Sequence, residues 1–343
     1  MARGRTAPRL VDVAERAGVS LATASRALSG RDGVSPAVAQ RVQEVASELG
    51  YVVNAHARSL AGGSASVVGL IVHQIDDPYF SEIAAGVISV AYEHGITVQI
   101  CHSARDPENE LRQIRTLIAN NVRAIIVAGS GYVGEDVETA AKRELAAFQD
   151  TGGRVAVIGR HALRADAVLP DNEDAGAALA EHLVELGHRR IAIASGTVNL
   201  TTVVDRLAGI ERALAGHGID IDDLPLVEAE FTRDGGAYAT ERIVADHPAT
   251  TAIIALNDAM AIGALATLRS HGIAVPSHMS VVGFDDVTVA ADLAPSLTTV
   301  RLPMTEMGAD ALMMALKDHS SRPRRRHTGH ELMVRDSSGP ARV

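Results

Sequence analysis

Polar and aromatic residues recur directly after short apolar segments in the second and larger part of this sequence. Several of these side chains can hydrogen-bond hydroxyl groups, and Tyr79 or Phe231 can stack on the face of a sugar. For any one of these residues taken alone, a loop or helix-capping role is the alternative to ligand binding. The evidence for a binding site is therefore their recurrence after successive apolar segments. The residues are those from His73 to Phe80, with Asp77, Tyr79 and Phe80 among them, and Ser130, Arg160, Ser195, Phe231, Thr232, Asn257, Asp258, Asp285 and Asp286.

Catalytic motifs are absent from the sequence. No GxGxxG directly follows its first apolar segment, 67–72, and it has no P-loop, no GxSxG and no HExxH. The 14 histidines are scattered, and we expect His188 and His217 to be solvated. The single cysteine, Cys101, follows an apolar segment and is expected to be packed. The sequence therefore predicts no enzyme, cofactor or metal site; an enzyme stays an alternative only by fold-level analogy.

The elements that must position these residues alternate between strand and helix. We expect strands over 67–72, 97–100, 124–128 and 155–158, and a second set over 190–194, 226–230, 252–255 and 280–283. Helices are expected over 80–94, 107–120 and about 135–150. This alternation predicts an α/β body of two lobes, each a doubly wound parallel sheet. Ligands bind at the carboxyl ends of such strands, where the polar residues stand.

The first 50 residues have a different pattern, with three short helices over 10–17, 21–28 and 36–49. Gly18 is a natural end for the first helix and Ser20 a natural cap for the second. Ser35 and Pro36 begin the third helix. The first two helices with their tight turn predict a helix-turn-helix, and an ordinary helical hairpin is the alternative.

In a helix-turn-helix the second helix lies in the major groove of DNA. Its exposed residues would be Leu21, Ala22, Ser25 and Arg26, and Arg26 could read a guanine edge through its two-donor fork. Thr23 and Ser25 could bind phosphate, which positions the protein without specifying a base.

The charge distribution agrees with two parts of different function. Residues 1–62 hold eight arginines and five acidic residues, a net charge of +3, while the whole chain carries −10, so the remainder carries −13. A basic head on an acidic body is typical of a DNA-binding module joined to a sensing domain. One cysteine excludes an intrachain disulfide, and no signal peptide or long apolar segment is visible. We therefore expect a cytoplasmic protein.

Motifs along the whole chain resemble the LacI family of transcriptional regulators. In the head these are VDVA at 11–14, AGVS at 17–20, TASRALSG at 23–30, VSP at 34–36, LGY at 49–51 and NAHARSL at 54–60. In the body they are DDPYF at 76–80, LGHRRIA at 186–192, DRLAG at 205–209, NDAMAIGA at 257–264, VVGFDD at 281–286, PSLTTV at 295–300 and LMVR at 332–335.

The resemblance implies a DNA-binding head over 1–53, a hinge helix and linker over 54–65, and an effector-binding and dimerisation body over 66–343 with a periplasmic-binding-protein-like fold. The first lobe would span about 66–163 plus 293–319, and the second about 164–292 plus 320–343. The hinge helix would add Asn54, Ala57 and Leu60 to the DNA-binding residues Ser20, Leu21, Ala22, Thr23, Ser25 and Arg26. Leu60 would wedge into the minor groove; a plain linker role is the alternative.

The same resemblance implies that Arg206, Asn257 and Asp285 contact an effector, with Phe231 at an aromatic lid position. A charged donor fork, an amide and a carboxylate suit a sugar or polyol. Asp77, Tyr79, Phe80, Ser130 and Arg160 complete the expected site, although the glycine before Arg160 departs from a common aspartate. The expected protein is a homodimeric repressor of a pseudo-palindromic operator, controlled by a small molecule, with no membrane partner. A periplasmic solute receptor would share the body, but the head disfavours it.

Overall fold

The computed structural model describes residues 8–29, 32–51, 67–134, 138–318, 320 and 322–342. The chain divides into two compact units, 1–66 and 67–343, and each is described by itself. In the described residues, no helix is long and apolar enough to cross a membrane.

The first unit is a bundle of three helices, α1 (Leu10–Ala17), α2 (Leu21–Ser29) and α3 (Pro36–Leu49). Gly18 ends α1 in the left-handed conformation, with a φ of 65°, which glycine adopts at little cost. The core is small and is built from Val13, Ala14, Ala17, Ala24, Ala27, Val42 and Ala46. Two inward residues of α2 are alanines, so α2 packs closely on its neighbours.

The first lobe of the second unit is built on a parallel sheet of six strands in the order β11-β5-β4-β3-β1-β2. Its strands are β1 (Val67–Val72), β2 (Thr97–His102), β3 (Ala124–Ala128), β4 (Arg154–Ile158), β5 (Asp166–Leu169) and β11 (Arg325–His327). Its helices are α5 (Pro78–Glu93), α6 (Pro107–Ala119), α7 (Thr139–Asp150) and α12 (Met304–Leu316). Helices α6 and α7 pack on one face of the sheet, and α5 and α12 on the other.

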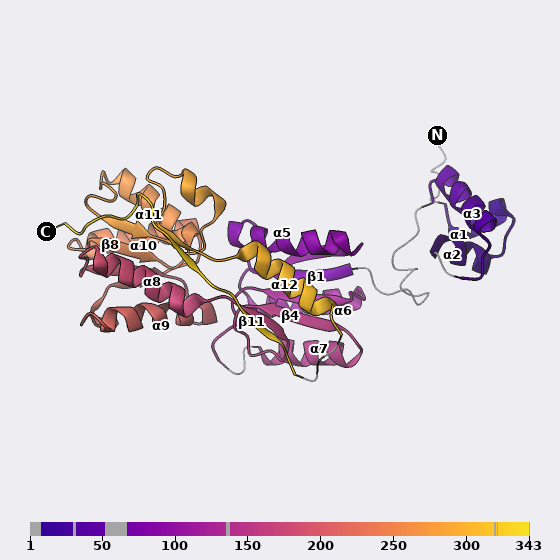
Figure 1. Ribbon diagram of the computed structural model, residues 1–343, viewed down its shortest axis with the longest axis horizontal. Coiled ribbons are helices and arrows are strands. Elements are labelled where there is room, and N and C mark those ends of the chain that lie inside the picture. Colours follow the sequence, from indigo (N-terminus) through magenta and orange to yellow (C-terminus); the bar gives the residue numbers. More distant parts are fainter. Residues whose placement is uncertain are drawn as a thin grey trace. The chain divides into compact units, whose positions relative to one another are not determined.

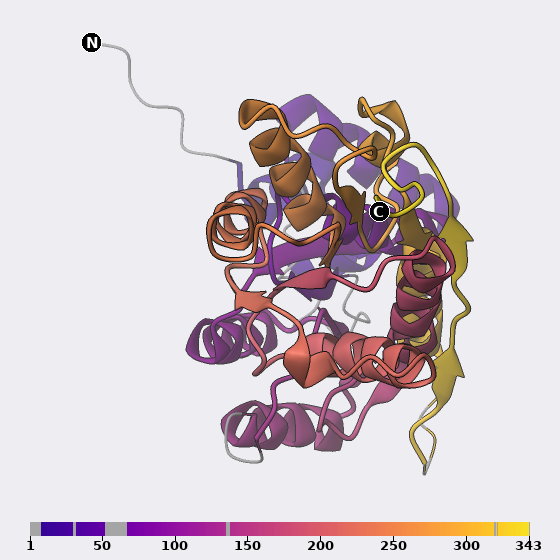
Figure 2. The same ribbon diagram turned by 90° about the vertical axis from the view of Figure 1, so that its left-hand side faces the viewer.

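The second lobe has a parallel sheet of four strands in the order β7-β6-β8-β9. The strands are β6 (Ile191–Ser195), β7 (Leu226–Glu228), β8 (Ala252–Ala255) and β9 (Ser280–Val282). The helices are α8 (Asn172–Glu185), α9 (Thr201–Ala215), α10 (Arg233–Asp246) and α11 (Asp258–Ser270), with short 3-10 turns at Ile221–Asp223 and Thr288–Asp292. Figure 2 shows the pairs α8–α9 and α10–α11 on either side of this sheet.

Close helix contact fixes the position of α9. A Cβ at Gly209 of α9 would collide with the carbonyl oxygen of Glu173, and one at Gly176 of α8 would collide with that of Arg206. Only glycine at these two positions lets the helix backbones approach so closely. The packing of α8 on α9 therefore fixes the backbone position of Arg206.

The chain passes between the lobes three times. It leaves the first lobe after β5, returns between β9 and α12, and leaves again after β11. The last two passes pair as an antiparallel ribbon of β10 (Thr299–Arg301) and β12 (Glu331–Met333). In Figure 1 the yellow carboxyl-terminal segment runs from one lobe to the other.

Four short strands were not expected from the sequence, and two of them change the division between the lobes. β5 pairs with β4, and β11 pairs with β5, so residues 166–169 and 325–327 belong to the sheet of the first lobe. The expected boundaries at about 164 and 320 are therefore corrected, because each strand continues the first sheet before the chain crosses. The strands of three or four residues lack a long apolar run by which the sequence could reveal them.

Candidate functional site

A cavity between the two lobes gathers polar side chains from the carboxyl ends of both sheets. His73 follows β1, Ser130 follows β3, Asn257 follows β8 and Asp285 follows β9, while α9 brings Arg206. The space is small, with a volume of about 30 Å³. This is the edge at which open α/β sheets bind ligands.

The cavity brings together eight of the nine expected effector contacts. They are Asp77, Tyr79, Phe80, Ser130, Arg206, Phe231, Asn257 and Asp285. Four further residues line it that were not among the expected effector contacts: His73, Arg105, Gly129 and Thr202. Of these, only His73 was among the residues noted after strand ends in the sequence.

Arg206 is the centre of the second lobe's wall. Its Nε donates to Oδ1 of Asn172 at 3.0 Å, its Nη2 donates to Oδ1 of Asp285 at 2.9 Å, and its Nη1 donates to the carbonyl of Leu256. The guanidinium lies 3.5 Å from the centroid of the Phe284 ring. A buried arginine with three acceptors and an aromatic face is held in one orientation, so its outward edge is a fixed donor.

Asp285 is the carboxylate that faces this arginine. Burial raises its pKa to about 7, while the charge and hydrogen bond of Arg206 act in the opposite direction. Its backbone has a φ of 116°, a conformation that residues other than glycine rarely adopt. Backbone strain of this kind is tolerated where the surroundings hold it and is frequent at binding sites.

Asn257 holds the backbone at Phe231 in place. Its Oδ1 accepts from the backbone N–H of Met260 at 2.8 Å, and its Nδ2 donates to the carbonyl of Phe231 at 3.3 Å. The next residue, Asp258, is fully buried and accepts from Thr299 and from the backbone of Val287. Asp258 therefore braces the loop after β9 and is absent from the cavity wall.

The wall of the first lobe is more apolar. Tyr79 and Phe80 meet edge to face with centroids 5.0 Å apart, and Asp77 caps α5 by accepting from the N–H of Tyr79 at 3.0 Å. Burial and the charge of Arg105 lower the pKa of His73 to about 3, so this ring is neutral. Its Nε2 donates to the carbonyl of Ser130 at 3.0 Å.

Arg160 is the expected contact that the structure places elsewhere. Its Nε and Nη2 both donate to the carboxylate of Asp205 on α9, and its carbonyl accepts from Thr201 at 2.8 Å. The side chain is half exposed at the rim, and Arg160 does not line the cavity. Its assignment as an effector contact is therefore corrected: it links the first lobe to the second.

Of the four further lining residues, His73 and Gly129 directly follow β1 and β3, and Arg105 comes three residues after β2. β2 ends at His102 and not at Ile100 as expected, so Arg105 stands close to the end of its strand. Thr202 lies in the first turn of α9, whose start the sequence did not reveal. The signal was present for Arg105, but the shortened strand hid it.

The first lobe carries a buried ionic cluster behind this wall. Nδ1 of His161 donates to Glu138 at 3.2 Å, and its Nε2 donates to the carbonyl of Gly129 at 2.9 Å. Burial alone would lower the pKa of His161, but Glu138 and Glu110 together raise it above its ordinary value. Glu110 is buried and its Oε2 has no hydrogen-bond partner among the described residues.

His188 is a correction, since it was expected to be solvated. It is buried and bonds to Thr251, Ser280 and the carbonyl of Gly339, which ties the amino ends of the second sheet to the carboxyl-terminal segment. No group of three or more His, Cys, Asp or Glu able to hold a metal occurs among the residues that the structure describes.

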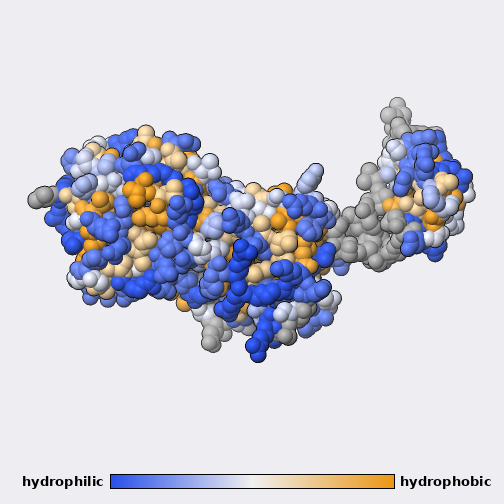
Figure 3. Space-filling model, in the orientation of Figure 1, coloured by the Kyte–Doolittle hydropathy of each residue, from blue (hydrophilic) through white to orange (hydrophobic). Residues whose placement is uncertain are grey.

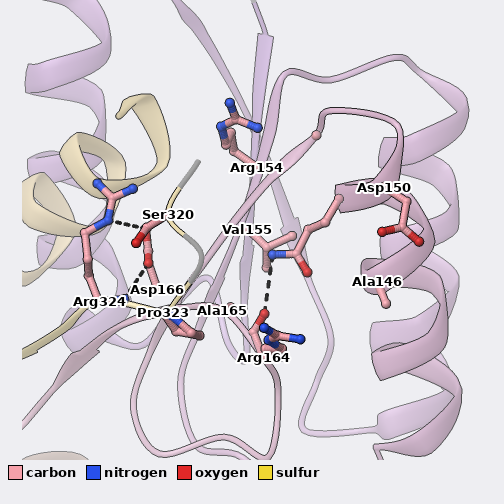
Figure 4. Close-up of a pocket in the computed structure, with 12 residues that line it drawn as sticks. Ala146, Asp150, Arg154, Val155, Arg164, Ala165, Asp166, Ser320, Pro323 and Arg324 are labelled. Atoms are coloured by element: carbon pink, nitrogen blue, oxygen red, sulfur yellow. Dashed lines mark hydrogen bonds and ion pairs between the residues drawn. The ribbon is translucent and has the colours of Figure 1, made fainter. Parts of the chain in front are cut away.

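A second hollow lies on the first lobe away from the cleft, with a volume of about 260 Å³ (Figure 4). Arg154, Asp166 and Arg324 line it at the amino ends of β4 and β5, opposite to the edge where such sheets bind ligands. The basic segment 322–326 was expected to be a solvated loop, with a phosphate-binding patch as the alternative. Part of it forms β11 instead, and Arg324 pairs with Asp166 at 3.4 Å.

In the head, α2 exposes Leu21, Ala22 and Arg26, while Ala24 and Ala27 face the core. Ser20 is exposed, and its Oγ accepts from the N–H of Thr23 at 3.1 Å. Thr23 and Ser25 are half-buried. The other expected DNA contacts, Asn54, Ala57 and Leu60, lie outside the described residues.

Comparison with known proteins gives the family. The profile of bacterial regulatory proteins of the lacI family matches residues 9–54, and that of the periplasmic binding protein-like domain matches 180–338. The transcriptional regulator DegA of Bacillus subtilis (strain 168) is 32% identical over 336 residues, which cover 96% of this chain and 98% of DegA. This chain belongs to the LacI family.

Two further relatives agree with this assignment. The transcriptional repressor PurR of Vibrio atlanticus (strain LGP32) is 31% identical over 316 residues, 91% of this chain and 93% of PurR. The solved complex of the transcriptional regulator CelR with cellobiose has a TM-score of 0.71 and 29% identity, and covers 96% of this chain and 99% of CelR. The chain is therefore a LacI-family transcriptional regulator with a DNA-binding domain and an effector-binding domain, and the expected fold class is confirmed. LacI-family regulators are not enzymes.

Proposed function

We propose that this LacI-family regulator is a repressor that binds a two-fold symmetric operator as a homodimer and responds to a sugar or sugar derivative bound between its lobes. The observation that carries the proposal is the cavity between the lobes, where Arg206, Asn257 and Asp285 converge with Phe231. The name of the relative PurR, a transcriptional repressor, supports the sign of regulation.

The head supports reading of DNA through α2. Leu21 and Ala22 offer apolar contacts to thymine methyl groups, and Arg26 offers a two-donor fork to a guanine. Ser20, Thr23 and Ser25 would hold phosphates, and Asn54, Ala57 and Leu60 would act in a hinge helix, as the family resemblance implies. Phosphate contacts make such binding dependent on salt.

Apolar surface on the first lobe supports pairing of two chains. Ile88 and Tyr92 on α5, Ile100 on the edge strand β2 and Met313 on α12 are all exposed. Helices α5 and α12 pack side by side, and Figure 3 shows apolar surface over them. Exposed apolar patches of this kind mark sites of protein association.

The chemistry of the cavity supports a hydroxylated ligand. Arg206 supplies donors and Asp285 supplies acceptors for neighbouring hydroxyls, while Phe231 supplies an aromatic face. CelR, a relative in fold and sequence, has been solved with cellobiose. The present cavity of about 30 Å³ is too small for a sugar, so binding would need movement of the lobes or of the lining side chains.

Closure of the lobes is the proposed link between ligand and DNA. A ligand that binds both lobes favours the closed arrangement by the difference between its affinities for the two states. That change would order or release the hinge segments of the dimer and couple the two sites by about 1–3 kcal/mol.

Selection of bound sequences from random DNA by the purified protein tests this function, with light scattering to give its mass. We expect an enriched two-fold symmetric motif and a dimer. No enriched motif would contradict specific DNA binding, and a monomer under the same conditions would contradict the homodimer.

A further inference from the structure

Arg105 enters the cavity from an unusual backbone. Ala104 and Arg105 both have a φ of 55°, in the left-handed region that costs energy for residues other than glycine. The turn is held by hydrogen bonds from Ala104 to the carbonyl of His73 at 2.8 Å and from Asp106 to that of Ser103 at 3.1 Å. This turn directs a largely buried arginine side chain, 16% exposed, into the space between the lobes.

The guanidinium of Arg105 has one ion pair and one aromatic neighbour there. Its nearest charged partner is Asp77, with Nη2 and Oδ2 3.6 Å apart, and it lies 5.6 Å from the centroid of Phe231 across the cleft. Among the described residues it donates no hydrogen bond, although a guanidinium has five N–H donors. Arg206 in the same cavity donates to three acceptors, whereas Arg105 donates to none among the described residues.

Neither carboxylate of the cavity accepts a hydrogen bond from Arg105, although Oδ2 of Asp77 forms an ion pair with it. Asp285 accepts from Arg206, and Oδ1 of Asp77 accepts from the N–H of Tyr79. Burial lowers the pKa of Arg105, and the charge of Asp77 acts against that shift. Asp77 supplies one opposite charge at 3.6 Å, but the N–H donors of Arg105 that face the cavity make no hydrogen bond among the described residues. A carboxylate or phosphate matches such a guanidinium fork with two parallel hydrogen bonds.

We propose that Arg105 is an anion subsite of the effector cavity and that the effector is a sugar derivative bearing a carboxylate or a phosphate. The inference rests on the proposed function of this cavity as the effector site. The hydroxylated part of the ligand faces Arg206, Asn257 and Asp285 of the second lobe, and its anionic group faces Arg105 of the first. Such a ligand joins the lobes, because its two ends bind to different ones.

Titration calorimetry with the full-length protein at constant ionic strength tests the inference. The probes are glucose, glucuronate and glucose 6-phosphate, and the corresponding galactose series. The variants are Arg105→Gln, which removes the charge, and Arg105→Lys, which keeps the charge without the fork. Arg112→Gln, at an exposed position of α6, is the matched control.

In at least one series we expect an anionic form to bind tenfold or more tightly than its neutral sugar. Arg105→Gln should reduce this preference to less than twofold, Arg105→Lys should retain part of it, and Arg112→Gln should retain all of it. A preference for carboxylate or for phosphate identifies the anion. Equal binding of neutral and anionic sugars, an unchanged preference in Arg105→Gln, or no binding of any anionic probe would each overturn the subsite.

Failure of the subsite and failure of the proposed function give different results. A neutral sugar that binds through Arg206 and changes operator affinity would retain the regulator and overturn the subsite. An anionic sugar that binds through Arg105 without changing operator affinity would retain the subsite and contradict the effector role.

Discussion

Arg160 of the first lobe and Asp205 of the second form an ion pair at the rim of the cleft, with Nη2 of the arginine 2.6 Å from Oδ1 of the aspartate. Beside it, Tyr132 and Leu200 form an isolated β-bridge between the lobes, and the N–H of Val133 donates to the carbonyl of Asn199 at 2.7 Å. These contacts exist only while the lobes are together. The pair therefore stabilises the closed arrangement without touching a ligand.

Asp205→Ala should weaken effector binding by a few-fold, because closure loses an ion pair. The pair is partly exposed, so the double-mutant cycle with Arg160→Ala should give about 0.5–1 kcal/mol and less at high salt. Arg212→Ala is the control, since its partners Glu173 and Asp174 are on α8 of the same lobe. Calorimetric titration of wild type, the two single variants and the double variant measures the coupling free energy between Arg160 and Asp205. Additive effects of the two substitutions would show that the pair does not act in closure.

Arg206→Ala should lose the effector response and keep operator binding. Removing the guanidinium leaves Asp285 buried without its partner, so the free energy of unfolding should fall by about 3–5 kcal/mol. The double variant Arg206→Met with Asp285→Asn removes both charges and should recover part of that stability. Denaturant unfolding and operator binding check both effects; an unchanged response at the wild-type ligand concentration would reject the site.

Glu110 should make the protein's stability depend on pH. Burial raises its pKa to about 7 in the folded chain, against about 4.3 in the unfolded chain. The folded state thus binds more protons between these values, and the free energy of unfolding should fall as pH rises from about 4 to 7 and then level off. Glu110→Gln should be more stable than wild type at pH 8 by up to about 3 kcal/mol, with little difference at pH 4.

Urea denaturation at several pH values checks this expectation. Glu108→Gln, at an exposed position of the same helix, should leave the pH profile unchanged. A wild-type profile that Glu110→Gln does not alter would show that Glu110 is ionised at no cost.

Leu60→Ala should weaken operator affinity and reduce DNA bending. This residue lies outside the described part of the chain, and the expectation comes from the family resemblance, in which the leucine wedges between base pairs. Ser64→Ala, which follows Gly62 and Gly63 in the expected linker, should change neither property. A bend angle measured by energy transfer between labelled DNA ends tests this; an unchanged angle in Leu60→Ala would favour a plain linker role.

The sequence predicted the regular parts of this structure well. The apolar runs 67–72 and 124–128 became β1 and β3 with the expected bounds, because buried parallel strands are continuously apolar. Strands β5, β10, β11 and β12 were missed because each is short and includes a charged residue, whereas the equally short β8 and β9 contain none. Gly18 shows the opposite case, since one residue type in one position was enough to predict the end of α1.

The sequence predicted which residues lie at the candidate site, but it did not predict which side chains pair with one another there. The strand-end rule found Ser130, Asn257 and Asp285, because topology alone brings carboxyl ends together. It could not distinguish Arg160 from Arg105, since the same rule admits both residues. Only the tertiary contacts show that Asp205 engages Arg160 at the rim while Arg105 is left facing the cavity.

The central claim is that a ligand in the cleft controls binding of the head to DNA. The most direct test is a gel-shift titration of the operator obtained by selection, using wild-type protein and Arg206→Ala, with and without a panel of neutral and anionic sugars. The account predicts that both proteins shift the operator and that one ligand changes the wild-type midpoint five-fold or more while leaving Arg206→Ala unchanged. A ligand that changes both proteins equally, or specific binding that no ligand in the panel alters, would contradict control from this cavity.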